Sequence, residues 1–161
     1  MEITDLLTSE SVISSLRAPS KKQALQELSR RAAEITGLHE RAIFDVLLER
    51  ERLGTTGVGC GIAIPHGKLS DLEELFGVFA RLENPVDFEA VDEQPVDLIF
   101  LLLAPESAGA DHLKALARIS RLLRDRTVCE RLRAATDQNS LFGLLTGKNQ
   151  NHATNNNCPN N

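Results

Sequence analysis

The sequence of 161 residues contains no tryptophan and no tyrosine, and phenylalanine is its only aromatic hydrocarbon side chain. Proteins that hold single-stranded nucleic acid stack its bases on aromatic rings, and this chain has few such rings. Its formal net charge of −5 also argues against a general nucleic-acid binder, because such proteins neutralise phosphates with lysine and arginine. We therefore expect no nucleic-acid partner.

Cysteines and long apolar runs are also scarce. The three cysteines (Cys60, Cys129 and Cys158) are odd in number and far apart, so neither a disulfide framework nor a metal-ligand pattern is expected. The longest apolar run, Leu98 to Ala104, has seven residues, whereas a membrane-spanning helix needs about 20. The first residues lack the basic and apolar regions of a secretory signal. These absences predict a cytoplasmic protein without a membrane span.

The overall composition is that of a globular domain. Apolar residues make up 42% of the chain and charged residues 25%, which is an ordinary balance. From Asn149 onward the sequence is rich in asparagine and almost without apolar residues, so it cannot offset the entropy lost on ordering. We predict one domain over residues 1–148 and a disordered tail over residues 149–161.

Strand and helix patterns alternate along the chain and predict an α/β fold. Ser20 with Gln23 forms a capping box before a helix that Gly37 ends, Thr127 is expected to cap a later helix, and Asn84-Pro85 should end a strand. Propensity alone suggests a parallel sheet in a three-layer α/β/α arrangement. The expected strands cover residues 12–16, 62–64, 75–82 and 96–103, with an edge segment at 86–88, and the expected helices cover about 21–36, 40–53, 111–124, 127–135 and 137–146.

The most informative stretch runs from Gly54 to Lys68. A glycine-rich loop leads into a short apolar strand that should deliver His66 to a sheet edge. Pro65 fixes the backbone before the histidine, and Gly67 after it lets a bulky group approach. Because imidazole titrates near pH ~6.5, much of it is an unprotonated nucleophile at neutral pH. Such a histidine beside backbone donors is typical of phosphoryl acceptance, although it could also simply end a strand.

The loop before His66 does not end in Lys-Ser or Lys-Thr, so it is not a nucleotide-binding phosphate loop. Its backbone amides and threonine hydroxyls are expected to help shape an anion site, and the alternative is a flexible connector. The residues assigned to this role are Gly54, Thr55, Thr56, Gly57, Gly59, Gly61, Pro65 and Gly67.

From Arg50 to Lys68 the sequence reads RERLGTTGVGCGIAIPHGK. It resembles the active-site segment of the mannitol/fructose class of phosphotransferase-system enzyme IIA, and is most similar to the nitrogen-type, regulatory branch. Looser similarity extends from about Ile3 to Leu145. The resemblance implies a mixed, partly antiparallel sheet within the three-layer sandwich. It also implies that His66 accepts a phosphoryl group on Nε2 while a backbone acceptor holds Nδ1. Cys60 departs from the pattern, since many relatives have asparagine or another polar residue there.

Two further residues acquire a role through this resemblance. Arg50 ends a core-facing stripe of a helix, where an arginine is commonly just solvated. His112 begins an apolar stripe that continues through Leu116 and Ile119, where a histidine is more often a satisfied core residue. The resemblance implies instead that Arg50 stabilises phosphoryl charge and that His112 hydrogen-bonds the phosphoryl group. No metal is expected, because nearby acidic residues lack ligand spacing.

The predicted function is that of a regulatory phosphocarrier in a nitrogen-type phosphotransferase system. A histidine phosphocarrier protein would phosphorylate His66, with phosphoenolpyruvate and enzyme I upstream and no cofactor. Targets such as potassium-transport or sensor-kinase components would respond to the phosphorylation state. One alternative is a sugar-specific enzyme IIA of fructose or mannitol type that passes phosphate to a IIB domain. Another is a binding module that is never phosphorylated. The arginines near residues 118–133 either decorate solvated faces or form a second, regulatory contact surface.

Overall fold

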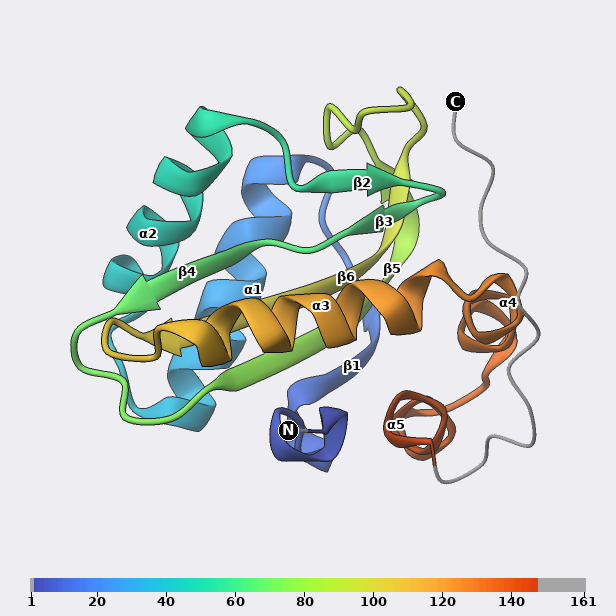
Figure 1. Ribbon diagram of the computed structural model, residues 1–161. Helices are drawn as coiled ribbons and strands as arrows, with labels where there is room; N and C mark the ends of the chain where they lie inside the picture. Colours follow the sequence, from blue (N-terminus) through green and yellow to red (C-terminus); the bar gives the residue numbers. More distant parts are fainter. Residues whose placement is uncertain (1, 148–161) are drawn as a thin grey trace.

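The structure is a computed structural model in which residues 2–147 are described (Figure 1). The predicted tail and the domain limit at residue 148 lie outside the described residues. The elements in chain order are η1 (Ile3–Asp5), η2 (Ser9–Ser11), β1 (Val12–Leu16), α1 (Lys21–Thr36), α2 (Glu40–Leu53), β2 (Gly57–Gly59), β3 (Ile62–Ala63), β4 (His66–Leu69), β5 (Phe76–Val86), β6 (Val96–Pro105), α3 (Ala110–Arg124), α4 (Arg126–Ala134) and α5 (Gln138–Thr146).

The six strands form one mixed sheet in the order β1-β5-β6-β3-β2, with β4 also paired to β6. Strands β5 and β6 are antiparallel, whereas β1 is parallel to β5, and β3 and β4 are parallel to β6. The connection from β5 to β6 covers residues 87–95 and contains no helix, so the chain returns antiparallel. This confirms the mixed sheet that the resemblance implied, and the parallel sheet suggested by propensity is wrong.

Helices cover both faces of the sheet, which confirms the three-layer α/β/α architecture (Figure 1). One core forms where α1 and α2 pack on the sheet, and a second forms beneath α3, α4, α5 and the N-terminal turn η1. Strand β6 supplies side chains to both cores, and all residues from Leu98 to Ala104 are fully buried. Burial on both faces explains why this strand reads as a continuous apolar run.

Strands β3 and β4 are two pieces of one interrupted strand beside β6. Ile62 pairs with Leu98 and His66 pairs with Leu102, so the register is unchanged across the gap. Pro65 lies in the gap and has no N–H to donate, but its carbonyl accepts a hydrogen bond from the Leu102 amide at 2.9 Å. Among the described strands β4 pairs only with β6, so His66 begins an edge strand, as predicted.

Some predicted boundaries are wrong. Strand β5 continues through Pro85 to Val86, because the pairing of β5 with β6 shifts register before Val86 and tolerates a residue without an amide. Gly57–Gly59 is not a loop but a short strand, β2, which pairs with β3. Helix α4 is capped by Asp125 and not by Thr127, since the aspartate carboxylate accepts hydrogen bonds from two amides of the first turn.

Candidate functional site

The backbone next to His66 fixes the orientation of its ring. Nδ1 lies 2.9 Å from the carbonyl oxygen of Ile64, which can only accept a hydrogen bond, so Nδ1 carries the proton. Proline at position 65 interrupts the strand at this point, which leaves the Ile64 carbonyl free to turn toward the ring. The lone pair of a neutral His66 is therefore on Nε2.

The guanidinium of Arg50 occupies the other side of the ring. Its Nε donates to Nε2 of His66 at 3.2 Å, and its Nη1 donates to the carbonyl oxygen of Gly54 at 2.9 Å. The second bond ties the last turn of α2 to the start of the loop. Among residues 2–147 no acceptor is paired with the remaining nitrogen, Nη2. Arg50 therefore keeps a hydrogen-bond donor that could bind an anion beside Nε2 of His66.

The surroundings of His66 favour its neutral form. Burial lowers the pKa of the half-buried imidazole below its ordinary value, and the positive charge of Arg50 lowers it further. The hydrogen bond to Ile64 and the charge of Glu51 act in the opposite direction but are outweighed. At neutral pH the ring is consequently uncharged, and its Nε2 lone pair accepts the hydrogen bond from Arg50.

His112 meets His66 from the first turn of α3. The ring centroids are 5.7 Å apart with an angle of 69° between the planes, so one ring presents its edge to the other. His112 is only 8% exposed, and its Nε2 is buried without a hydrogen-bond partner in the described part of the chain. Burial is also the main cause that lowers its pKa, followed by repulsion from His66 when that ring is protonated and by the positive charge of Lys68. His112 is therefore not a satisfied core residue.

Glu51 was not identified by the sequence reasoning, yet it organises the loop. Its carboxylate is buried, lies 2.9 Å from Nζ of Lys21, and accepts hydrogen bonds from both the amide and the hydroxyl of Thr56. Lys21 also lies over the ring of Phe88, 4.9 Å from its centroid. One feature of the sequence could have identified Glu51. It is an acidic residue in the last turn of α2, where the helix dipole disfavours negative charge.

The loop residues divide into those near His66 and those that shape the fold. The amide of Ile64 donates to the Thr56 carbonyl, so the Glu51 contacts hold the residue that orients His66. The threonine hydroxyls donate elsewhere: Thr55 to the Phe88 carbonyl at 2.8 Å, and Thr56 to Glu51. The structure thus brings Gly54 to Arg50 but does not direct either hydroxyl donor toward the histidines.

Two predictions about glycines receive a different physical explanation. Gly67 was expected to leave room for a bulky group, but it is buried, and a Cβ there would lie 2.3 Å from Val46 of α2. Its role is close packing of α2 on β4. Gly59 and Gly61 flank Cys60 in the β2–β3 turn, where all three residues have positive φ. These two glycines permit the turn and do not face the histidines.

Residues 5–148 match the protein family described as EIIA 2 of the phosphoenolpyruvate-dependent sugar phosphotransferase system. The chain belongs to this family. A nitrogen regulatory protein of Bradyrhizobium diazoefficiens is 63% identical to this enzyme IIA over 90% of this chain and 95% of its own length. The nitrogen regulatory protein of Escherichia coli strain K12 is 42% identical over 91% of this chain and 90% of its own.

A solved structure gives the same assignment. The nitrogen regulatory protein IIA-Ntr from Neisseria meningitidis superimposes with a TM-score of 0.83 and 33% identity, covering 89% of this chain and 98% of that one.

In the described residues of this enzyme IIA, no helix is long and apolar enough to cross a membrane, and no three His, Cys, Asp or Glu side chains are grouped to hold a metal ion.

Proposed function

We propose that this type-2 enzyme IIA accepts a phosphoryl group on Nε2 of His66 from a histidine phosphocarrier protein, and that its phosphorylation state controls target proteins. The observation that carries the proposal is the hydrogen-bond pattern of His66. The Nδ1–H of His66 donates to the Ile64 carbonyl and Arg50 donates to Nε2, so only the tautomer with its lone pair on Nε2 satisfies both bonds.

The transfer needs no metal and no net proton movement. The lone pair of Nε2 forms the new P–N bond while the P–N bond of the donor phosphohistidine breaks and its electron pair returns to the donor ring. As the phosphoryl group arrives, the Arg50 donor on Nε2 turns to a phosphoryl oxygen. Arg50 then meets the charge that is spread over the equatorial oxygens, and His112 offers its unpartnered Nε2 to one of them.

The relatives favour regulation over sugar transport. Two relatives that match nearly the whole chain, at 63% and 42% identity, are named nitrogen regulatory proteins. Their name describes them, and we extend it to this chain as part of the proposal. Phosphoenolpyruvate and enzyme I would act upstream, and the targets would include potassium-transport or sensor-kinase components. One phosphoryl group adds about −1.5 to −2 charges, which is enough to change which surfaces can bind around His66.

Intact-mass measurement after incubation with phosphoenolpyruvate, enzyme I and the phosphocarrier tests this proposal. We expect one phosphoryl group that is lost in mild acid, and no phosphoryl group on a His66→Gln variant. His39→Gln is the matched control, because His39 is an exposed histidine at the start of α2 and caps no amide. Labelling of the His66→Gln protein, or no labelling of the wild type, would overturn the proposal.

A further inference from the structure

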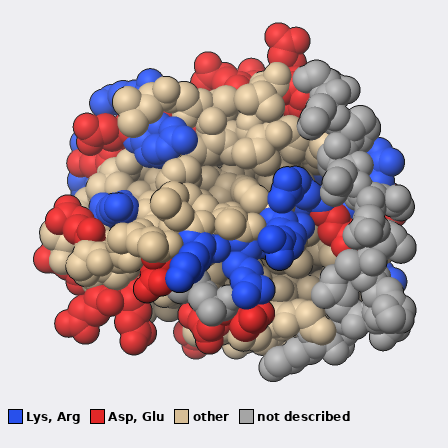
Figure 2. All heavy atoms as spheres, in the orientation of Figure 1, with Lys and Arg blue, Asp and Glu red and all other residues tan. Residues whose placement is uncertain are grey.

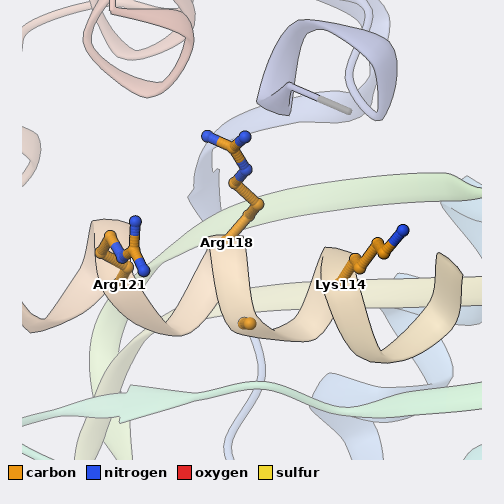
Figure 3. A pocket seen from close by; sticks show the side chains of 4 residues that line it. Lys114, Arg118 and Arg121 are labelled. Atoms are coloured by element: carbon orange, nitrogen blue, oxygen red, sulfur yellow. The ribbon is translucent and has the colours of Figure 1, made fainter. Parts of the chain in front are cut away.

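The charged residues near the two histidines differ in whether they reach the His66 ring. Lys114, Arg118 and Arg121 project from one side of α3 and line a hollow of about 270 Å³ (Figure 3). Figure 2 shows basic side chains gathered along this helix on the surface of the molecule. Since each residue advances a helix by about 100°, the three lie roughly opposite to His112 around the axis. This basic stripe therefore faces away from the two histidines.

Glu51 is charged as well, but its side chain lies in the interior. It follows Arg50 in the last turn of α2, is 8% exposed, and has its carboxylate 2.9 Å from the Lys21 ammonium. The helix dipole disfavours a carboxylate at this end of a helix, and a buried ion pair commonly stabilises a protein no more than apolar side chains of similar size. Folding stability alone therefore does not explain an acidic residue at this position.

The carboxylate fixes the residue on which the backbone of Ile64 depends. Pairing with β6 stops at Ala63 and resumes at His66, so Ile64 lies in the gap of the interrupted strand. The Ile64 amide donates to the Thr56 carbonyl at 3.0 Å, and the Ile64 carbonyl accepts the Nδ1–H of His66 at 2.9 Å. Thr56 is itself buried, and both its amide and its hydroxyl donate to Glu51.

One turn of α2 thereby reaches both nitrogens of the His66 ring. Arg50 donates directly to Nε2 at 3.2 Å, whereas Glu51 acts on Nδ1 through the main chain of Thr56 and Ile64. Consecutive residues of a helix point about 100° apart, so one side chain can meet the ring while the next meets the loop. The hydrogen bond at Nδ1 decides which nitrogen of the neutral ring carries the proton.

We propose that Glu51 is a positioning residue for phosphoryl transfer, and that through Thr56 and Ile64 it holds His66 in the tautomer whose lone pair is on Nε2. The inference rests on the proposed function, which it deepens by naming the residue that keeps the acceptor competent. A ring with its proton on Nε2 has no lone pair there, so it can neither accept from Arg50 nor form the P–N bond. The rate of transfer is therefore proportional to the fraction of protein with the proton on Nδ1.

Two double variants separate the hydrogen bonds of Glu51 from its charge. Lys21→Met/Glu51→Gln and Lys21→Met/Glu51→Leu both remove the ion pair and leave neither partner as an unpaired charge. Glutamine retains an oxygen that can accept from the Thr56 amide, whereas leucine has no acceptor. Any effect of the lost charges on His66 is common to the two proteins, so the difference between them reports the contact with Thr56.

The tautomer is read from the ¹⁵N signals of the His66 side chain at a pH where the ring is neutral, and transfer is followed by single-turnover labelling from the phosphocarrier. We expect the leucine variant to populate the tautomer with the proton on Nε2 and to transfer about threefold more slowly, or less. The glutamine variant should keep more of the Nδ1 proton and lose less of the rate. In both, the rate should fall in proportion to the tautomer that is lost.

Three results would overturn the proposal. The leucine variant could keep the wild-type tautomer and rate, the two variants could change the tautomer equally, or transfer could slow with the tautomer unchanged. The last result would show that Glu51 only supports the fold.

Thr56→Val covers the case in which the leucine variant does not fold. Valine keeps the shape of the side chain and removes only the hydroxyl that donates to Glu51, so a smaller change of the His66 tautomer in the same direction is expected. A wild-type tautomer in that protein would then overturn the proposal. If the wild type is labelled and every folded variant keeps the Nδ1 proton, only this inference fails. If the phosphocarrier does not label the wild type, the proposed function fails, whatever the tautomers show.

Discussion

His66 and His112 face each other, but the two regions that carry them are built in opposite ways. His66 has both ring nitrogens in hydrogen bonds, one to the carbonyl of Ile64 just before its strand and one from Arg50 of α2. His112 is more deeply buried, yet its Nε2 has no partner in residues 2–147. The orientation of the His66 ring is therefore fixed by the chain itself, whereas the Nε2 of His112 keeps an unused capacity for a hydrogen bond.

The difference originates in the local backbone. The sequence Ile-Pro-His interrupts a strand, and the interruption frees the carbonyl of Ile64, two residues before His66. A second set of bonds, from Lys21 through Glu51 to Thr56, holds the chain that carries this carbonyl. In residues 2–147 the first turn of α3 offers no equivalent hydrogen bond to Nε2 of His112. Substitutions around His66 and substitutions of His112 should consequently differ in their effects on stability and on phosphoryl transfer.

The largest effect is expected at Arg50. In the proposed reaction the Arg50 guanidinium meets the phosphoryl charge. Replacing Arg50 by alanine removes it, and loss of one such donor typically slows catalysis by about 100-fold or more. The folding stability should change little, because the side chain is only partly buried. Single-turnover phosphorylation by the phosphocarrier measures the rate. Arg52→Ala, an exposed arginine in the same turn, is the control and should transfer normally; equal rates in the two variants would exclude Arg50 from the reaction.

Glu51 should affect folding stability more than chemistry. Glu51→Gln leaves the Lys21 ammonium without its buried carboxylate, and the loss should be about 2–3 kcal/mol in the free energy of unfolding. Urea denaturation measures it, with Glu49→Gln, an exposed glutamate of the same helix, as the control. Adding Lys21→Met should recover part of the loss, since no uncompensated charge then remains. A Glu51→Gln protein as stable as the control would show that the network does not hold the loop.

His112 should show the reverse pattern. Replacing it by leucine removes a buried polar atom without a partner, so stability should stay constant or rise by about 1 kcal/mol. Phosphoryl transfer should nevertheless slow about tenfold, because a hydrogen bond to the phosphoryl group is lost. Thermal unfolding and single-turnover kinetics on the same sample separate the two effects. A strongly destabilised variant would instead identify His112 as a core residue with a structural role.

The smallest effect concerns pH. Both histidines have a pKa below the ordinary value in the folded state, so the unfolded chain takes up protons first as the pH falls below about 6.5. Stability should accordingly be constant above that pH and decrease below it. In the Arg50→Ala protein the pKa of His66 should rise, because one cause of its lowering is removed. Imidazole NMR titration measures this shift; a pKa that falls or stays constant would contradict the electrostatic explanation.

The sequence predicted those parts of the site that depend on neighbouring residues better than those that depend on packing between elements. The string around Pro65 and His66 was sufficient to predict an edge-strand histidine, and the resemblance brought Arg50 and His112 together in one site. Glu51 and Lys21 were missed because they are 30 residues apart in the chain and only the packing of α1 against α2 shows their contact. Gly67 was misread for the same reason, since its close neighbour Val46 belongs to another element.

In the fold, too, local features were predicted and features that depend on distant residues were not. Helix ends with local signals, such as Ser20 and Gly37, were correctly predicted. The direction of β6 relative to β5 was not predictable from propensity, because it depends on whether the connection contains a helix. Strand β2 was missed because the glycines of Gly57–Gly59 disfavour a strand locally, and only pairing with β3 makes it one.

The most direct test of the account is NMR of the protein labelled with ¹⁵N in its histidine side chains, before and after phosphorylation. The structure predicts that unphosphorylated His66 carries its proton on Nδ1. The proposed function predicts that phosphorylation adds a phosphorus coupling to Nε2 of the same ring. A phosphoryl group on Nδ1 of His66, or on another histidine, would contradict the account.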